Sequence, residues 1–403
     1  MKSFTTYLKE EKDKLGHGSD AQEGAKLKHI HHAEDRPLMH GHEGFEHAHG
    51  ALTQAHEHMK AGKSDSSLSM KYDGSPAVVY GHHPESGKFF VASKSAFNKN
   101  PKINYSHEDI QKHHGHAPGL ADKLSAALTH LPKVAPKKGV FQGDLMHSKT
   151  DVDHNEKKGS ASFTPNTITY TAHGDEAKKV KDSHVGIVTH TEYHGKDLDS
   201  MHAKPLESEK GFKQHDDVYQ KSASHDTSKI NYPADAQKKF QAHMDKAKQI
   251  HDTHGSKMYS AVHPSHSGEG GHLATYINST VRTGDKPSAE GFQKHVQGHF
   301  DKAADKLKSE AGQAKKKAEG ASHVEHVEKN KEHYNNLLNM HDELHQAKNT
   351  LVKHLETHEG GLDHTIEGKK SKPEGFVVQH KDEPTKLVNR AEFARANLLK
   401  VRK

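Results

Sequence analysis

The sequence predicts an α+β protein whose mixed and antiparallel sheets are interrupted by a large helical insertion. Apolar runs typical of strands are concentrated in residues 65–195, and they return after residue 372. The stretch between them is rich in Lys, His, Ala and Glu and has helical periodicity. We therefore expect a polar N-terminal tail (1–32), a first part of the sheet domain (33–196), a helical insertion (197–372) and the C-terminal strands of the sheet domain (373–403).

The first part is expected to begin with a helix and to continue with strands. Apolar spacing after the break at Pro37 predicts an amphipathic helix over about 33–61. Residues 67–80 are apolar on both sides of Asp73-Gly74-Ser75-Pro76, which predicts a β-hairpin or a strand–turn–strand. Another strand is expected at 88–92, after a turn that contains Pro and Gly.

The rest of this part alternates one helix with strands. Residues 119–131 predict a helix because four leucines fall on one stripe: Leu120, Leu124, Leu128 and Leu131. Strands are expected at 139–146, 167–172 and 185–191.

The insertion is expected to be helical at 235–253 and 288–318. Residues 323–358 predict one long packed helix or an antiparallel helical hairpin, since their apolar spacing drifts between three and four. Strands return at 374–379 and 385–388.

Composition limits the classes of function. Hydrophobic residues are 31% of the 403 residues and charged residues 28%, and the mean hydropathy is −1.02, which predicts a core built from part of the chain and solvated helices around it. The net charge of +5 fits a phosphate-bearing partner without identifying one. The 43 histidines would make the protein strongly cationic on mild acidification. The absence of cysteine excludes disulfides, thiolate catalysis and cysteine zinc sites.

No segment has the apolar length of a signal peptide or of a membrane-spanning helix. We expect a soluble cytoplasmic protein with no membrane partner.

The tetrapeptide Lys71-Tyr72-Asp73-Gly74 places a lysine at the end of a predicted strand, just before a tight turn. A lysine becomes a nucleophile when burial or nearby cations lower its pKa. Gly74 would allow a backbone to approach a triphosphate closely. Taken alone, the tetrapeptide favours an ordinary turn lysine over a nucleophile.

Five further segments follow in an order that resembles the superfamily of ATP-dependent nucleic-acid ligases and mRNA-capping nucleotidyltransferases. The first motif of that superfamily, lysine-x-Asp-Gly, matches Lys71, Asp73 and Gly74. The later matches are Ser93-Lys94, the strand 140–144 that ends in Gly143-Asp144, the segment 185–193 that ends in Tyr193, Glu374-Gly375-Phe376-Val377, and Lys386.

The resemblance implies a ligase-type nucleotidyltransferase domain and a role for each matched residue. Lys71 would form a lysyl-nucleotide, and Lys386 would neutralise the α-phosphate in the transition state. Nucleotide binding would use Asp73, Gly74, Ser93, Lys94, Lys386 and Asp144, the last as acceptor from a ribose hydroxyl. Glu374 would hold Mg²⁺ or Mn²⁺ for ATP or another nucleoside triphosphate. The base would stack on Tyr193 or lie near Ile187.

The chain departs from the superfamily pattern in three places. Lys94 stands where the superfamily has arginine, and this exchanges a planar fork for a point charge. Val388 occupies the position of a second lysine, for which Arg390 is an alternative. The sequence ends soon after Lys386, so no C-terminal OB domain is expected.

Longer segments (KYDGSPAVVYG, GKFFVASKSAFNKNPK, GVFQGDLM and FTPNTITY) resemble an uncharacterised protein family of T-even-like tailed phages, especially those that infect cyanobacteria. This implies a phage protein in the host cytoplasm, with a possible phage protein partner.

Our leading hypothesis is an ATP-dependent polynucleotide ligase that joins a nucleic acid with a phosphate end. RNA is favoured because minimal RNA ligases lack the OB domain. One alternative is nucleotidyl transfer to an RNA 5′ end or to a protein. Another is an inactive structural or nucleotide-sensing phage protein, suggested by Val388.

Two other features allow either a functional interpretation or a solvated, structural one. Histidines at 29, 31 and 32 and at 113, 114 and 116 have spacings that metals accept, but histidine is spread over nearly all polar segments. Lysines at 302, 306, 308 and 315–317 fit a nucleic-acid clamp or a solvated helix face. We favour solvated, structural roles for both. The histidines reflect a general compositional bias, and no aromatic stripe for base stacking accompanies the lysines.

Overall fold

A computed structural model describes residues 30–65, 67–98, 100–206, 208–262, 268–381 and 383–390. Most of the predicted tail, including His29, lies outside the described residues, as does the chain after residue 390. The described chain has several sheets and a helical region, which confirms the predicted mixed α and β class.

The chain divides into two compact units, each built from separate stretches of sequence. We call them the sheet unit (Ser64–Asp226 and His358–Pro384) and the helical unit (His31–Lys63, Thr227–Thr357 and the described residues from Thr385). This division differs from the predicted boundaries at four places. Residues 36–61 and the described residues from Thr385 join the helical unit, whereas residues 197–226 and 358–372 add strands to the sheet unit.

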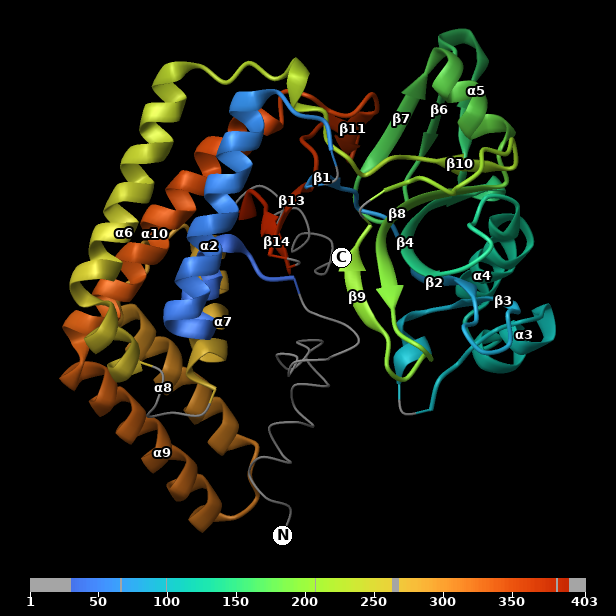
Figure 1. Ribbon diagram of the computed structural model, residues 1–403. Coiled ribbons are helices and arrows are strands. Elements are labelled where there is room, and N and C mark those ends of the chain that lie inside the picture. Colours follow the sequence, from blue (N-terminus) through green and yellow to red (C-terminus); the bar gives the residue numbers. More distant parts are fainter. Residues whose placement is uncertain are drawn as a thin grey trace. The chain divides into compact units, whose positions relative to one another are not determined.

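The largest sheet of the sheet unit has the order β10-β8-β4-β2-β3, with β9 paired to β8. Its strands are β2 (Ala77–His82), β3 (Phe89–Ala92), β4 (Val140–Ser148), β8 (Val185–His194), β9 (His202–Pro205) and β10 (Val218–Gln220). All neighbours are antiparallel except β10 and β8. Helices α3 (His107–His114) and α4 (Pro118–His130) lie beside β2 and β3 (Figure 1).

The two faces of this sheet bury different apolar clusters because side chains alternate along each strand. On one face Leu124 and Leu131 pack with Tyr80, Phe141 and Ile187. The predicted leucine stripe of 119–131 is thus a core face, and the strands predicted at 88–92, 139–146 and 185–191 are confirmed.

Two smaller sheets complete the sheet unit. One has the order β12-β11-β7-β6-β5, is antiparallel throughout, and packs with α5 (Gly174–Asp182). Its strands are β5 (Asp153–Asn155), β6 (Ser160–Phe163), β7 (Thr169–His173), β11 (Asp363–Ile366) and β12 (Lys369–Lys370). The other has the order β1-β13-β14, with β1 (Leu68–Lys71), β13 (Gly375–His380) and β14 (Glu383–Leu387).

Residues 67–80 form a strand–turn–strand, whereas the alternative expectation of a β-hairpin is wrong. β1 pairs with β13, and β2 pairs with β3 and β4 in a different sheet. The segment between β1 and β2 is held by contacts with residues 166–168 and β4, so the two strands cannot fold back on each other.

The helical unit contains α2 (Arg36–Ala61), α6 (Ala234–Val262), α7 (Glu269–Thr283), α8 (Ala289–Asp305), α9 (Glu310–Lys329) and α10 (Lys331–Leu355). α6 packs along α10, and α8 along α9 (Figure 1). A single helix over 323–358 is wrong, because the chain breaks at Asn330 (φ −112°, ψ 21°). The Asn330 side chain donates to the carbonyl of His326 at 2.9 Å and so ends α9.

A fully buried ion pair lies inside the helical unit. Lys348 Nζ donates to Glu34 Oε1 at 2.5 Å, and both side chains are 0% exposed. Burial raises the pKa of Glu34, but the charge of Lys348, the hydrogen bond with His345 and the charge of Arg390 together outweigh burial and hold the pKa well below its ordinary value. Next to this pair, Arg390 pairs with Asp35, to which His341 is hydrogen-bonded at 3.0 Å.

We predict that Lys348→Ala lowers the free energy of unfolding of the helical unit by about 3–5 kcal/mol, because Glu34 then remains charged and buried without its main partner. Lys353→Ala is the matched control, since Lys353 is exposed on the same helix, and it should change the free energy by no more than about 0.5 kcal/mol. Urea titration followed by far-UV circular dichroism measures both. Equal midpoints for the two variants would contradict a structural role for the pair.

Candidate functional site

Lys71 lies at the end of β1, beside the residue that precedes β13. The antiparallel register puts Lys71 opposite Gly375, the first residue of β13. Glu374, the residue before Gly375, therefore lies just past the last paired residues. Lys71 Nζ donates to Glu374 Oε2. The Lys71 side chain is 28% exposed, so its amine can be reached from solvent. The structure thus brings together two predicted site residues that are far apart in the sequence.

Asp73 is buried, and its carboxylate holds the turn that follows β1. It accepts hydrogen bonds from Asn166 Nδ2 at 2.8 Å, from the Thr167 N–H at 2.7 Å and from the Ile168 N–H at 3.0 Å. The N–H of Asp73 donates to the hydroxyl of Tyr170 at 2.7 Å. These contacts fix the turn, and through the backbone they fix the position of Lys71 at the end of β1.

Gly74 allows this turn to lie directly against β4. A Cβ atom at Gly74 would be 2.6 Å from the Cβ of Asp144 and 3.1 Å from the carbonyl oxygen of Leu145. Two backbone hydrogen bonds continue the contact, from Ser75 N–H to Leu145 O at 2.9 Å and from Leu145 N–H to Pro76 O at 3.0 Å. Only a residue without a side chain fits between the turn and Asp144.

Asp144 faces His190, which occupies a bulge in β8. The partner of β4 moves from Thr191 to Thr189 between Gln142 and Gly143, which leaves His190 as the extra residue. His190 Nε2 lies 3.6 Å from Asp144 Oδ2, and its Nδ1 is 2.8 Å from Thr191 Oγ1. Inspection of the sequence did not identify His190, because no residue pattern there marks the bulge.

The electrostatic environment of Asp144 keeps its carboxyl group ionised. Burial raises its pKa, but His190, Lys71 and Lys94 together outweigh burial and bring the pKa below its ordinary value. The charges of Lys71 and Lys94 therefore act on Asp144, although neither ammonium group forms an ion pair with it in the described residues.

The remaining predicted residues of the sheet unit have packing or capping contacts. Ser93 Oγ accepts from the Ser95 N–H at 3.3 Å and so begins the short 3₁₀ helix Lys94–Phe97, on which Lys94 is exposed. Tyr193 is 3% exposed, and its hydroxyl donates to Gln142 Oε1 at 2.7 Å. Its ring packs against Phe97, so no face of Tyr193 opens widely to solvent. Ile187 is buried in the core on the other face.

Lys386 and Arg390 belong to the helical unit. The boundary between the units falls inside β14, between Pro384 and Thr385. The structure does not bring Lys386 together with Lys71 as part of one unit. Arg390 pairs with Asp35 there, which accounts for its charge without a nucleotide.

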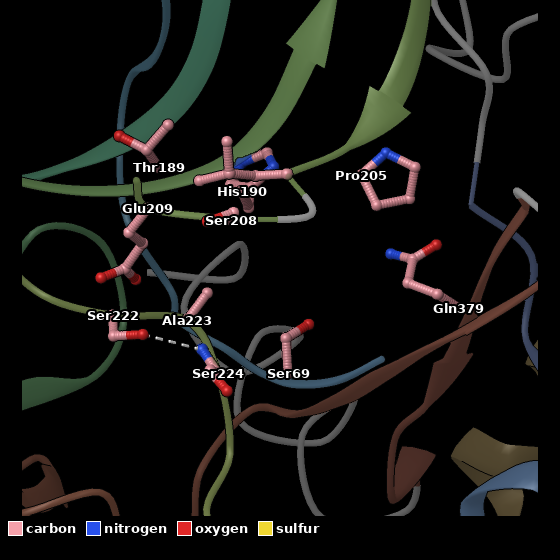
Figure 2. A pocket seen from close by; sticks show the side chains of 11 residues that line it. Ser69, Thr189, His190, Pro205, Ser208, Glu209, Ser222, Ala223, Ser224 and Gln379 are labelled. Carbon is pink, nitrogen blue, oxygen red and sulfur yellow. Dashed lines mark hydrogen bonds between the residues drawn. The ribbon is translucent and has the colours of Figure 1, made fainter. Parts of the chain in front are cut away.

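A pocket of about 270 Å³ adjoins His190 within the sheet unit. Ser69 of β1 and Gln379 of β13 form one wall, and Thr189 and His190 of β8 form another (Figure 2). Ser69 and Lys71 lie on the same face of β1, since they are two residues apart. Among the residues that the structure describes there, the lining has many hydroxyl groups and one carboxylate, that of Glu209, but no lysine or arginine.

Glu374 is the residue predicted to hold a divalent metal, and its carboxylate is 14% exposed. Mg²⁺ commonly binds one or two carboxylates together with substrate phosphates and water. The Glu374 carboxylate fits that donor set. Among the described residues, two groups of three potential metal ligands have ligand atoms within 4.8 Å of one another. Neither group contains Glu374 or any of the histidines that the sequence analysis considered as metal ligands.

Comparison with known proteins assigns the chain to a family. One family model matches residues 27–402, which is nearly the whole sequence. The chain belongs to the DUF6267 family, a family of unknown function. No curated protein and no solved structure matches it. Within the described part of this DUF6267 chain, no helix is long and apolar enough to cross a membrane.

We predict that Gly74→Ala lowers the free energy of unfolding of the sheet unit by about 1–3 kcal/mol, because the new methyl group must displace the turn or β4. Gly119→Ala is the matched control: Gly119 has open space around its Cβ direction and lies in α4, where alanine favours the helix. Thermal unfolding should show a lower midpoint only for the first variant. A wild-type midpoint for Gly74→Ala would mean that the close approach does not exist.

Proposed function

We propose that the sheet unit forms a covalent lysyl-nucleotide at Lys71. The neutral Nζ of Lys71 attacks the α-phosphorus of a nucleoside triphosphate and forms a nitrogen–phosphorus bond. The bond from that phosphorus to the bridging oxygen of the β-phosphate breaks, and pyrophosphate leaves with the bonding electrons. The contact of Lys71 with Glu374, in one unit with Asp144, is the observation that carries the proposal.

Lys71 must lose a proton before it attacks, and Glu374 is placed to accept it. The carboxylate already contacts the ammonium group, so the transfer needs no rearrangement of the side chain. Glu374 would also hold the divalent ion, which when bound supplies positive charge to the phosphates. ATP with Mg²⁺ or Mn²⁺ is the first combination to test.

Asp144 is suited to bind the ribose. Its lowered pKa keeps it an acceptor at neutral pH, and a carboxylate that accepts from a hydroxyl group forms a strong charge-assisted hydrogen bond. The neighbouring pocket supports a place for the uncharged part of the nucleotide, because its lining has hydroxyl and amide groups rather than the cations that a polyphosphate needs.

The second step is transfer of the nucleotide to an acceptor. The resemblance to ligases favours a polynucleotide with a phosphate end, and RNA before DNA. Lys386 would neutralise the α-phosphate during transfer. The resemblance of several segments to tailed-phage proteins favours activity in a host cytoplasm during infection. These assignments rest on the motifs in the sequence.

We predict that the purified protein, incubated with α-labelled ATP and Mg²⁺, acquires a label that survives denaturation. Lys71→Met, which removes the amine but keeps the apolar stem, should abolish the label. Lys88→Met is the matched control, since Lys88 is an exposed lysine of the same unit, and it should retain full labelling. Denaturing gel electrophoresis measures the three proteins. Label that persists in Lys71→Met would exclude Lys71 as the nucleophile.

Two further variants examine the supporting residues. Glu374→Gln should lose most of the label, because the amide neither takes the proton nor binds the metal well. Lys386→Ala should lose label if that lysine assists the first step. The phosphoramidate itself should be released by acidic hydroxylamine.

The alternatives give different outcomes of the same experiment. Labelling by GTP in place of ATP would indicate transfer to an RNA 5′ end, and label on an added second polypeptide would indicate a protein acceptor. Reversible nucleotide binding without covalent label would indicate the inactive, nucleotide-sensing protein and would contradict the proposal.

A further inference from the structure

Three potential metal ligands meet between α2 and α6 of the helical unit. His42 and Glu46 lie one turn apart on α2 and therefore share a face. His251 projects from α6, and its Nε2 is 3.6 Å from Glu46 Oε1. One ligand atom of each residue lies within 4.8 Å of the other two. The sequence shows the pair on α2 but gives no indication of its partner on α6.

His251 is held in one orientation by its neighbours. Its Nδ1 is 2.9 Å from the hydroxyl of Tyr259, which leaves Nε2 directed toward Glu46. Phe45 stacks on the ring at 3.9 Å between centroids, and the ring of His42 is stacked at 4.9 Å. A histidine that binds metal commonly uses its second nitrogen in a hydrogen bond that fixes the ring.

His251 is enclosed by its surroundings. The side chain is 7% exposed, so its ring has little freedom to turn away from Glu46. The nearest basic side chain on α6, Lys248, donates to Asp252 at 2.7 Å, so its charge already has a partner.

We propose that His42, Glu46 and His251 bind a divalent transition-metal ion of the Zn²⁺ type and join α2 to α6. Two imidazole nitrogens and one carboxylate oxygen are a donor set that Zn²⁺ accepts. A tetrahedral ion with bonds of about 2.1 Å places its ligand atoms about 3.4 Å apart, close to the 3.6 Å between His251 and Glu46. His42 and Glu46 are exposed and can adjust, and a fourth position opens to solvent.

The other group of three ligand atoms among the described residues provides a contrast. His130 Nδ1 lies 3.1 Å from Asp217 Oδ2, and His184 completes the set. Lys133, however, donates to the same carboxylate oxygen of Asp217. Its ammonium group occupies that oxygen, so Asp217 would have to release Lys133 before this group could bind an ion.

The test is Zn²⁺ binding by the full chain after chelator treatment, measured in competition with a chromophoric chelator strong enough to exclude weak sites formed by the many surface histidines. We expect one tight Zn²⁺ per chain in the wild type. His42→Ala and His251→Ala should lower the affinity at least 100-fold, and Tyr259→Phe about 10–100-fold because it removes the hydrogen bond that orients His251. His130→Ala is the matched control and should bind as the wild type does.

A second readout protects the test against misfolded variants. Saturating Zn²⁺ should raise the thermal midpoint of the wild type, because a ligand that binds only the folded state stabilises it. His42→Ala should fold normally, since His42 is exposed, yet gain nothing from Zn²⁺. The proposal fails if the wild type has no stoichiometric tight site, or if His42→Ala and His130→Ala bind Zn²⁺ equally. Neither result depends on nucleotide transfer at Lys71.

Discussion

The position of Lys71 depends on the buried carboxylate of Asp73. Each of its hydrogen bonds comes from a neutral donor to a charged acceptor, a kind worth about 1.5–3 kcal/mol net. All three donors lie within residues 166–168, so one side chain ties the end of β1 to the start of β7. The aspartate two residues after Lys71 thus holds the turn through its own hydrogen bonds.

Two backbone features then bring the remaining groups together. Gly74 removes the side chain that would separate the turn from Asp144. The bulge in β8 adds one residue, and that residue, His190, faces the same carboxylate. Asp144 therefore lies in a partly buried position beside His190, where the influence of His190, Lys71 and Lys94 outweighs burial and lowers its pKa. Neither regular strand pairing nor a longer side chain at position 74 would permit this.

The sequence predicted elements well where local patterns decide them, and poorly where pairing over long distances does. The leucine stripe of α4 and the apolar runs of β4 and β8 were readable because burial of one face imposes a period. For β1 and β2 the sequence left a β-hairpin and a strand–turn–strand open, since pairing with the distant strands β13 and β4 decides between them. The break at Asn330 was not readable either, because one side-chain hydrogen bond causes it and the apolar pattern continues across it. The proximity of Glu374 to Lys71 came from family resemblance and not from periodicity, and His190 had no signal.

The two proposed sites would select different metals through the softness of their ligands. Glu374 offers only carboxylate oxygen, which suits Mg²⁺ or Mn²⁺ shared with phosphates. His42 and His251 offer nitrogen, which the borderline transition ions prefer and Mg²⁺ does not. A cation that serves nucleotide chemistry at Glu374 would thus not compete for the helical unit. A Zn²⁺ ion between α2 and α6 would act on the stability of that unit without entering the phosphate chemistry.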